Sequence, residues 1–243
     1  MRIDVLDGGY VQLIEAYGVG KEGRLEYEDG VVKSTDFEVG IIEAARMSTG
    51  RGFNGWEQDE KLLKFLYANR HMSPFEMAGM IVEVKAPIFV FREWHRHRTQ
   101  SYNEMSGRYI PLPDENYRPS SERLIASQAA TSNKQAQGTS GFEMTPDSVR
   151  QDLEVLDAVY NHAQESYQYL LKRGWPKELA RLVVPVSRYS RMRAHANLRN
   201  WLQFLTLRMD PAAQWEIRRY ANAVGALIEN FFPKTWNAYI LAR

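Results

Sequence analysis

The segment that most constrains the fold of this chain is a polar run of fourteen residues, 96–109, with the sequence RHRTQSYNEMSGRY. It contains three arginines, one histidine, one glutamate, two serines and two amide side chains, but no lysine. A core cannot easily accept this mixture, because each polar group buried without a partner costs about 2–7 kcal/mol. Guanidinium forks suit bidentate capture of phosphate or carboxylate. The run therefore predicts an anion-binding site, with an irregular solvated loop as the alternative.

The composition is typical of a soluble globular protein. The 243 residues are 44% hydrophobic and 25% charged, which is enough apolar material for a real core. A net charge of +1 argues against a polycation that binds nucleic acid. No apolar run approaches the ~18 residues of a membrane span, and residues 1–10 lack the apolar core of a signal peptide. We therefore expect one cytoplasmic domain, residues 1–243, with no membrane or nucleic-acid partner.

The chain has no cysteine. This excludes disulfides, zinc–thiolate sites, iron–sulfur clusters and cysteine nucleophiles. We predict no metal site, and the chemistry must depend on other residues or on a cofactor.

The hydrophobic pattern predicts an α+β fold dominated by helices, with most of the strands in the first hundred residues. Alternating and β-branched residues predict strands at 10–17 and 80–85. Ser73 and Glu76 have the form of a capping box around Pro74, and Asp36 is the expected N-cap of the first helix. The predicted helices are residues 36–47, 58–69, 88–95, 145–173, 195–209 and 211–231.

Residues 111–145 differ from the rest of the chain, because they are rich in Ser, Gln, Ala, Pro and Gly. Loops of this length are uncommon within a compact domain, and those that occur are functional lids or disordered segments. We predict an active-site lid or loop here.

A second arginine-rich region runs from 181 to 208, with six arginines and no Lys, Asp or Glu. Surface arginines that cover apolar residues with their stems are one explanation. A ligand site is the other, since Asn197, Asn200 and Arg208 fall near one stripe of the predicted helix, with its two ends about 16 Å apart. The opposite stripe is a predicted core face and consists of Leu198, Trp201, Leu202 and Leu205.

At residues 96–108 the chain resembles the flavin-dependent thymidylate synthases, whose signature is an Arg-His-Arg followed by spaced Ser, Asn-Glu, Ser and Arg. Further blocks in the family's order are residues 71–76, 86–90, 133–135, 180–185 and 197–217. The resemblance implies a helix-dominated fold with an antiparallel sheet and a homotetramer whose active sites are shared between subunits. It also implies conversion of dUMP to dTMP, with 5,10-methylenetetrahydrofolate as carbon donor, FAD as hydride carrier and NADPH as reductant. The missing cysteine agrees with this flavin route.

The same resemblance implies roles for individual residues. Arg208 would be catalytic, stabilising the ionised uracil ring at its third nitrogen, and Ser106 would be a hydrogen-bond partner of the ring. A nucleophilic role for Ser106 needs an adjacent base, and none is evident. His71 would lie on the folate or nicotinamide side of the flavin. The implied dUMP contacts are Glu93, Arg96, Glu104, Ser106, Gly107, Arg108, Arg181 and Arg208. The implied FAD contacts are Ser73, Arg96, His97, Arg98, Glu104, Asn197, Arg199 and Gln203.

Three positions depart from the family's usual residue. Glu93 and Gln203 stand where Gln and Asn are common and keep hydrogen-bonding capacity, but Ala212 stands where a His is common. Two other functions stay open at this point: a nucleic-acid-binding module that uses both arginine clusters, and a flavoprotein that binds nucleotide without methyl transfer. His95 is expected only to shape the end of its helix.

Overall fold

The computed structural model describes residues 1–21, 25–28, 31–128 and 144–243, which form the α+β fold that the sequence predicts. The main sheet is antiparallel, with strand order β1-β2-β5-β7-β6. Its strands are β1 (Arg2–Val5), β2 (Gly9–Tyr17), β5 (Gly79–Pro87), β7 (Tyr189–Asn197) and β6 (Ser101–Glu104). A second, two-stranded sheet pairs β3 (Leu25–Glu28) with β4 (Val31–Thr35).

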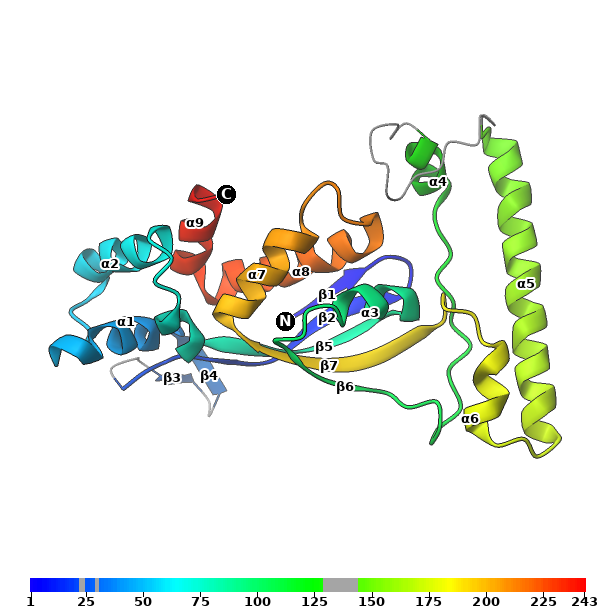
Figure 1. Ribbon diagram of the computed structural model, residues 1–243, viewed down its shortest axis with the longest axis horizontal. Coiled ribbons are helices and arrows are strands. Elements are labelled where there is room, and N and C mark those ends of the chain that lie inside the picture. The colour runs from blue at the N-terminus through cyan, green and yellow to red at the C-terminus, as the bar shows by residue number, and fades with distance from the viewer. Residues whose placement is uncertain (22–24, 29–30, 129–143) are drawn as a thin grey trace.

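The helices fall into three groups around the main sheet (Figure 1). Over one face lie α3 (Ile88–Trp94), α7 (Leu198–Arg208) and α8 (Trp215–Phe231). At one end of the sheet are α1 (Val39–Arg46), α2 (Trp56–Ala68) and α9 (Pro233–Leu241), with the short 3-10 helices η1 (Met47–Thr49) and η2 (Ser73–Met77). At the other end, α5 (Pro146–Lys172) stands beside α4 (Ser121–Gln128), α6 (Lys177–Ala180) and the 3-10 helix η3 (Arg181–Val183).

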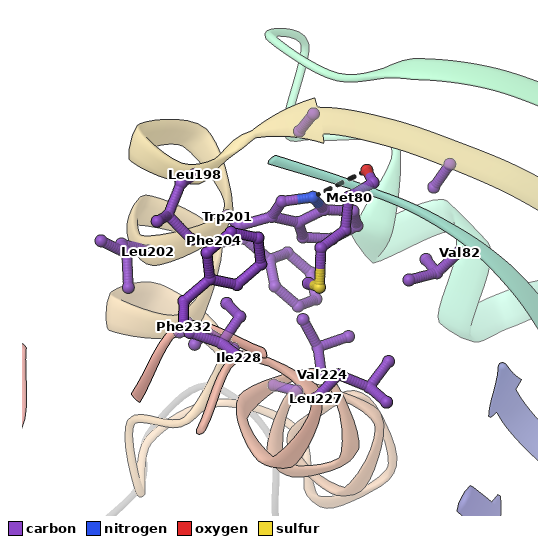
Figure 2. Close-up of a cluster of buried hydrophobic side chains, with 14 of the residues drawn as sticks. Met80, Val82, Leu198, Trp201, Leu202, Phe204, Val224, Leu227, Ile228 and Phe232 are labelled. Atoms are coloured by element: carbon purple, nitrogen blue, oxygen red, sulfur yellow. Dashed lines mark hydrogen bonds between the residues drawn. The ribbon is translucent and has the colours of Figure 1, made fainter. Parts of the chain in front are cut away.

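The core lies between the sheet and helices α7 and α8 (Figure 2). Met80 and Val82 of β5 point into it, because alternate residues of a strand face the same side. The indole of Trp201 is fully buried there and donates from Nε1 to the carbonyl oxygen of Met80 at 3.1 Å. All four residues of the predicted core face are buried. Each fully buried side chain of this size stabilises the fold by about 1.5–3 kcal/mol, so α7 is held firmly on the sheet.

Most of the predicted elements are confirmed, but the region before α7 is a strand and not a helix. Residues 195–197 belong to β7, which pairs with β5 along its whole length from Gly79↔Asn197 to Pro87↔Tyr189. The sequence shows the strand in its alternation, since Met192 and Ala194 are buried while Arg193 and His195 are exposed. The predicted helix at 211–231 also begins later, at Trp215.

Both predicted side-chain caps in the first half of the chain are wrong. Glu38, not Asp36, holds the N-cap position of α1, and Asp36 instead accepts a hydrogen bond from the Glu38 backbone nitrogen at 3.1 Å. Ser73 begins a 3-10 helix in which no side-chain cap forms. Glu76, the expected second half of that box, forms an ion pair with Arg199 of α7 instead.

Part of the predicted lid has defined contacts. Asn116 forms a β-bridge with Arg188, and the fully buried Arg188 donates from Nη1 to the Pro113 carbonyl at 2.7 Å and to Asp114 at 2.8 Å. Residues 121–128 form α4. Residues 129–143, which include the family block at 133–135, lie outside the described residues. A lid role for 111–145 stays a prediction.

None of the helices in the described ranges combines the length and the hydropathy needed to cross a bilayer.

Candidate active site

Arg208 lies in the last turn of α7 and forms hydrogen bonds with α3 and with the turn that follows α3. Its Nε donates to Nε2 of His97 at 2.9 Å, and its Nη1 donates to Oε2 of Glu93 at 3.0 Å. Its Nη2 donates to the main-chain carbonyl oxygen of Glu93, also at 3.0 Å. We call these three residues the Arg208 cluster. The contacts join positions more than 110 residues apart in sequence, because α3 and α7 pack on the same face of the sheet.

The electrostatics of the Arg208 cluster depend on partial burial. A histidine nitrogen that accepts a hydrogen bond carries no proton, so His97 is neutral. Burial first, and the Arg208 charge second, lower the pKa of His97 to about 4. Burial also raises the pKa of Glu93, while Arg208 opposes that rise and Glu216 adds to it. The cluster therefore holds one cation against one carboxyl group and one neutral imidazole.

The His97 ring is fixed by the core beneath it. It packs edge-on against Phe204, with ring centroids 4.9 Å apart, and Phe204 stacks on Trp94 at 4.6 Å. The main-chain carbonyl of His97 accepts a hydrogen bond from the Tyr102 hydroxyl at 2.7 Å. The ring packing and this hydrogen bond together fix the direction of Nε2, the acceptor that faces Arg208.

A second group of candidate residues surrounds an open cavity of about 520 Å³, which we call the Ser106 cavity. This volume lies within the range of small-molecule sites. One wall is the chain that leaves β6, with Glu104, Ser106 and Gly107, and Arg181 approaches from η3. Helix α3 closes another side with Arg92 and His95. The remaining lining residues are Ile88, Phe91, Met105, Leu112, Leu182, Val184, Val186 and Ser190.

A tight turn shapes the wall at Ser106. The carbonyl oxygen of Ser106 accepts hydrogen bonds from the backbone nitrogens of Tyr109 and Ile110. The Ser106 hydroxyl oxygen accepts a hydrogen bond from the Arg108 nitrogen at 3.3 Å. A Cβ on Gly107 would lie 3.1 Å from the Leu112 side chain, so glycine lets the turn sit close to the following chain. Arg108 points toward α6, where its Nε lies 3.2 Å from Glu178.

The third group lies at the start of α7. Asn197 caps this helix by accepting a hydrogen bond from the Asn200 nitrogen at 3.0 Å, which satisfies one of the free N–H groups of the first turn. Arg199 pairs with Glu76, and Gln203 is exposed one turn further along. Ser73 and His71 lie on the neighbouring segment, and both are exposed. Asn197 is therefore a cap and not a member of a helical stripe.

One chain does not bring all predicted dUMP residues together. Ser106, Gly107, Glu104 and Arg181 share one cavity. The other four, Glu93, Arg96, Arg108 and Arg208, do not line it. Arg96 and Arg98 are exposed, and within the described part of the chain their side chains make no hydrogen bond or ion pair. Ala212 lies in the exposed turn between α7 and α8, where its nitrogen donates to Asp210 at 2.8 Å.

Two basic residues of the Ser106 cavity were missed by the sequence analysis. Arg92 was not considered, and His95 was expected only to shape a helix end. His95 does hold the C-cap position of α3, but it also lines the cavity. The signal that could have found them is helical spacing, since positions 88, 92 and 95 share one face of a helix that leads into the arginine run. Among the described residues no group of three or more His, Asp or Glu side chains could hold a metal ion.

Comparisons with known proteins find relatives along nearly the whole chain. A family model described as thymidylate synthase complementing protein matches residues 30–234. A flavin-dependent thymidylate synthase of Thermus thermophilus is 37% identical, over 98% of this chain and 78% of its own length. One from Thermotoga neapolitana is 35% identical, over 99% and 94%. Among solved structures, the UMP/dUMP methylase PolB from Streptomyces cacaoi, bound with 5-Br dUMP, superposes with a TM-score of 0.80 at 29% identity, over 98% and 97% of the two chains.

Proposed function

This chain belongs to the family of flavin-dependent thymidylate synthases, and on that premise we propose that it carries out the reductive methylation of dUMP to dTMP. The observation that carries the proposal is the Ser106 cavity, where signature residues and a distant arginine line a space of mononucleotide size. The likeness to a methylase bound with 5-Br dUMP supports the same substrate. The rival nucleic-acid-binding function finds no support in these relatives.

In the proposed reaction, dUMP lies in the Ser106 cavity. Arg181 and the newly identified Arg92 offer guanidinium groups to the phosphate, with Arg108 at the edge of the same wall. The Ser106 hydroxyl can donate a hydrogen bond to the uracil ring while its oxygen still accepts from the turn. Among the described residues His95 is the only imidazole that lines the cavity, and no hydrogen bond joins it to the Ser106 hydroxyl. We therefore assign Ser106 to binding and not to nucleophilic attack.

Arg208 is the proposed catalytic residue. Two of its five N–H groups, one on each Nη, have no acceptor among the described residues. They can stabilise negative charge on the uracil ring as it accepts the one-carbon unit. Removal of one such preorganised donor typically costs about 100- to 1,000-fold in turnover.

FAD fits the exposed polar groups that the fold places around the start of the arginine run. The guanidinium groups of Arg96 and Arg98 have no partner among the described residues and suit a pyrophosphate. Nε2 of His97 already accepts from Arg208, so a contact of His97 with FAD uses its other atoms. When bound, the flavin supplies the hydride that reduces the transferred one-carbon group. The remaining residues proposed to hold it are Ser73, Glu104, Asn197, Arg199 and Gln203.

The proposal includes 5,10-methylenetetrahydrofolate as carbon donor, NADPH as reductant and a cytoplasmic location. His71 is exposed and meets Phe65 edge to face, with ring centroids 5.9 Å apart, and its ring is open to contact with folate or nicotinamide in turn. The Ser106 cavity and the Arg208 cluster are separate within one chain. We therefore propose a homotetramer in which one copy supplies the cavity and another supplies Arg208 and Arg96.

The test is dTMP formation from dUMP by purified protein, with FAD, NADPH and the folate donor each omitted in turn. We expect a yellow protein that releases FAD on denaturation, and product only in the complete mixture. A colourless protein that cannot be reconstituted with FAD, or a complete mixture without dTMP, would refute the proposed function.

A further inference from the structure

The guanidinium group of Arg208 is fixed by three hydrogen bonds within the described chain. A guanidinium group has five N–H donors in a fixed plane, and three of these are taken by acceptors that cannot easily move. One acceptor is a main-chain carbonyl, one is a packed imidazole and one is the Glu93 carboxylate. Three hydrogen bonds in different directions fix both the position and the plane of the group.

Glu93 supplies two of these three acceptors. Its main-chain oxygen holds Nη2, and its side chain holds Nη1 in the ion pair that Arg208 makes within the described chain. The side chains of Arg208 and Glu93 are 19% and 27% exposed, so solvent screens their attraction only partly. Loss of the carboxylate would leave the guanidinium with Nε and Nη2 bonds alone, free to tilt about the line that joins them.

A direct role of Glu93 on the nucleotide fits this geometry less well. A carboxylate repels a phosphate, and protonation or release from Arg208 would be needed before it could donate to a uracil oxygen. The charged groups around it are Arg208 on α7 and Glu216 on α8, and His97 is held neutral by burial. The strongest partner within reach is Arg208, and that bond is already formed.

We propose that Glu93 is a positioning residue that acts on the reaction through Arg208, and that it does not bind dUMP. His97 holds the same guanidinium group by accepting the hydrogen bond from Nε. The proposal rests on the proposed function, because the position of Arg208 matters only where Arg208 acts on a substrate. It changes the role of Glu93 that the family resemblance implies.

The test is a double-mutant cycle on the FAD-loaded protein, with Glu93→Ala, Arg208→Ala and the combined variant. In the wild-type background we expect Glu93→Ala to lower kcat about 10- to 100-fold, because small misplacements of a catalytic group have effects of this size. KM for dUMP should change by less than about threefold, because the Ser106 cavity is intact. In the Arg208→Ala background the same change should alter kcat by less than about twofold.

Two further variants keep the test decisive. Glu93→Gln retains an oxygen acceptor for Nη1 and should restore kcat to within about tenfold of wild type, with unchanged KM. This isosteric variant carries the test if Glu93→Ala does not fold. Glu60→Ala removes an exposed partner of Lys64 on α2 and is the matched control, with wild-type kinetics expected.

The proposal is overturned if Glu93→Ala or Glu93→Gln raises KM for dUMP tenfold or more at unchanged kcat. It is also overturned if the loss from Glu93→Ala is equally large in the Arg208→Ala background. In both cases an active wild-type enzyme shows that the proposed function still stands. A wild-type protein that forms no dTMP refutes the proposed function and this inference with it.

Discussion

At the residue scale, His97 owes its protonation state to its surroundings. A proton on Nε2 would be poorly hydrated against Phe204 and would face the Arg208 cation. We therefore expect the imidazole to stay neutral down to about pH 4. An NMR titration of the histidine ring signals, with the His97 signal assigned by its loss in His97→Gln, measures this pKa.

The lowered pKa of His97 also makes the free energy of unfolding depend on pH. Between about pH 4 and the ordinary value of 6.5 the unfolded chain binds more protons at His97 than the folded chain does. The stabilising contribution of His97 is therefore complete above pH 6.5 and is lost as the pH falls toward 4. Glu93 acts in the opposite direction, because its pKa is raised in the folded state and its protonation favours that state. A His97 pKa at or above 6.5 would contradict the contact with Arg208.

Ser106→Ala should weaken dUMP binding without abolishing turnover. The hydroxyl lines the cavity, and loss of one hydrogen bond of about 1 kcal/mol raises KM roughly fivefold. Steady-state kinetics with varied dUMP measure the change, and an unchanged unfolding midpoint serves as the control for the fold. Complete loss of activity with intact dUMP binding would restore a nucleophilic role for Ser106.

The limits of sequence reasoning are clear at this scale. Ser106 and Gly107 could be found because their motif is local, and Arg181 because it begins an arginine-rich region; all three line one cavity. The partner of Glu93 could not be found, because Arg208 lies 115 positions away and only the packing of α3 and α7 on the same sheet brings them together. Arg92 was missed because it precedes the motif by one helical turn.

At the scale of elements, the boundary between β7 and α7 shows how two periods compete. The stretch before Asn197 alternates polar and small residues, whereas the stretch after it has apolar residues at helical spacing. The predicted helix at 195–209 continues the helical pattern across the Asn197 cap into residues that belong to β7. The predicted start of α5 was correct, because Thr145 and Pro146 are strong local signals for a helix N-terminus.

The N-cap of α5 is testable without reference to catalysis. The Thr145 hydroxyl accepts from the Ser148 nitrogen at 3.2 Å, and the Ser148 hydroxyl oxygen accepts from the Thr145 nitrogen at 2.9 Å. Thr145→Ala should lower the free energy of unfolding by about 1 kcal/mol, whereas Thr145→Ser should leave it nearly unchanged. Urea denaturation followed by far-UV circular dichroism measures both. Equal stability of the two variants would show that the box contributes nothing.

At the scale of the whole molecule, the sheet order explains why the proposed site is divided. The chain leaves β6 at the sheet edge and runs toward α6 with Ser106 and Arg108, while α7 ends over the face of the sheet with Arg208 (Figure 1). Strand pairing between residues a hundred positions apart is non-local, and no local pattern encodes it. The sequence could predict the fold class and the family, but not this separation.

We propose that one nucleotide site uses the Ser106 cavity of one copy and Arg208 of another. Arg181→Ala and Arg208→Ala are each expected to be nearly inactive alone. Coexpressed with different tags and purified through both, they should form dTMP at about one quarter of the wild-type rate, because random pairing leaves about one site in four with both arginines. A doubly tagged protein no more active than either single variant would show that the cavity and Arg208 are not supplied by different copies.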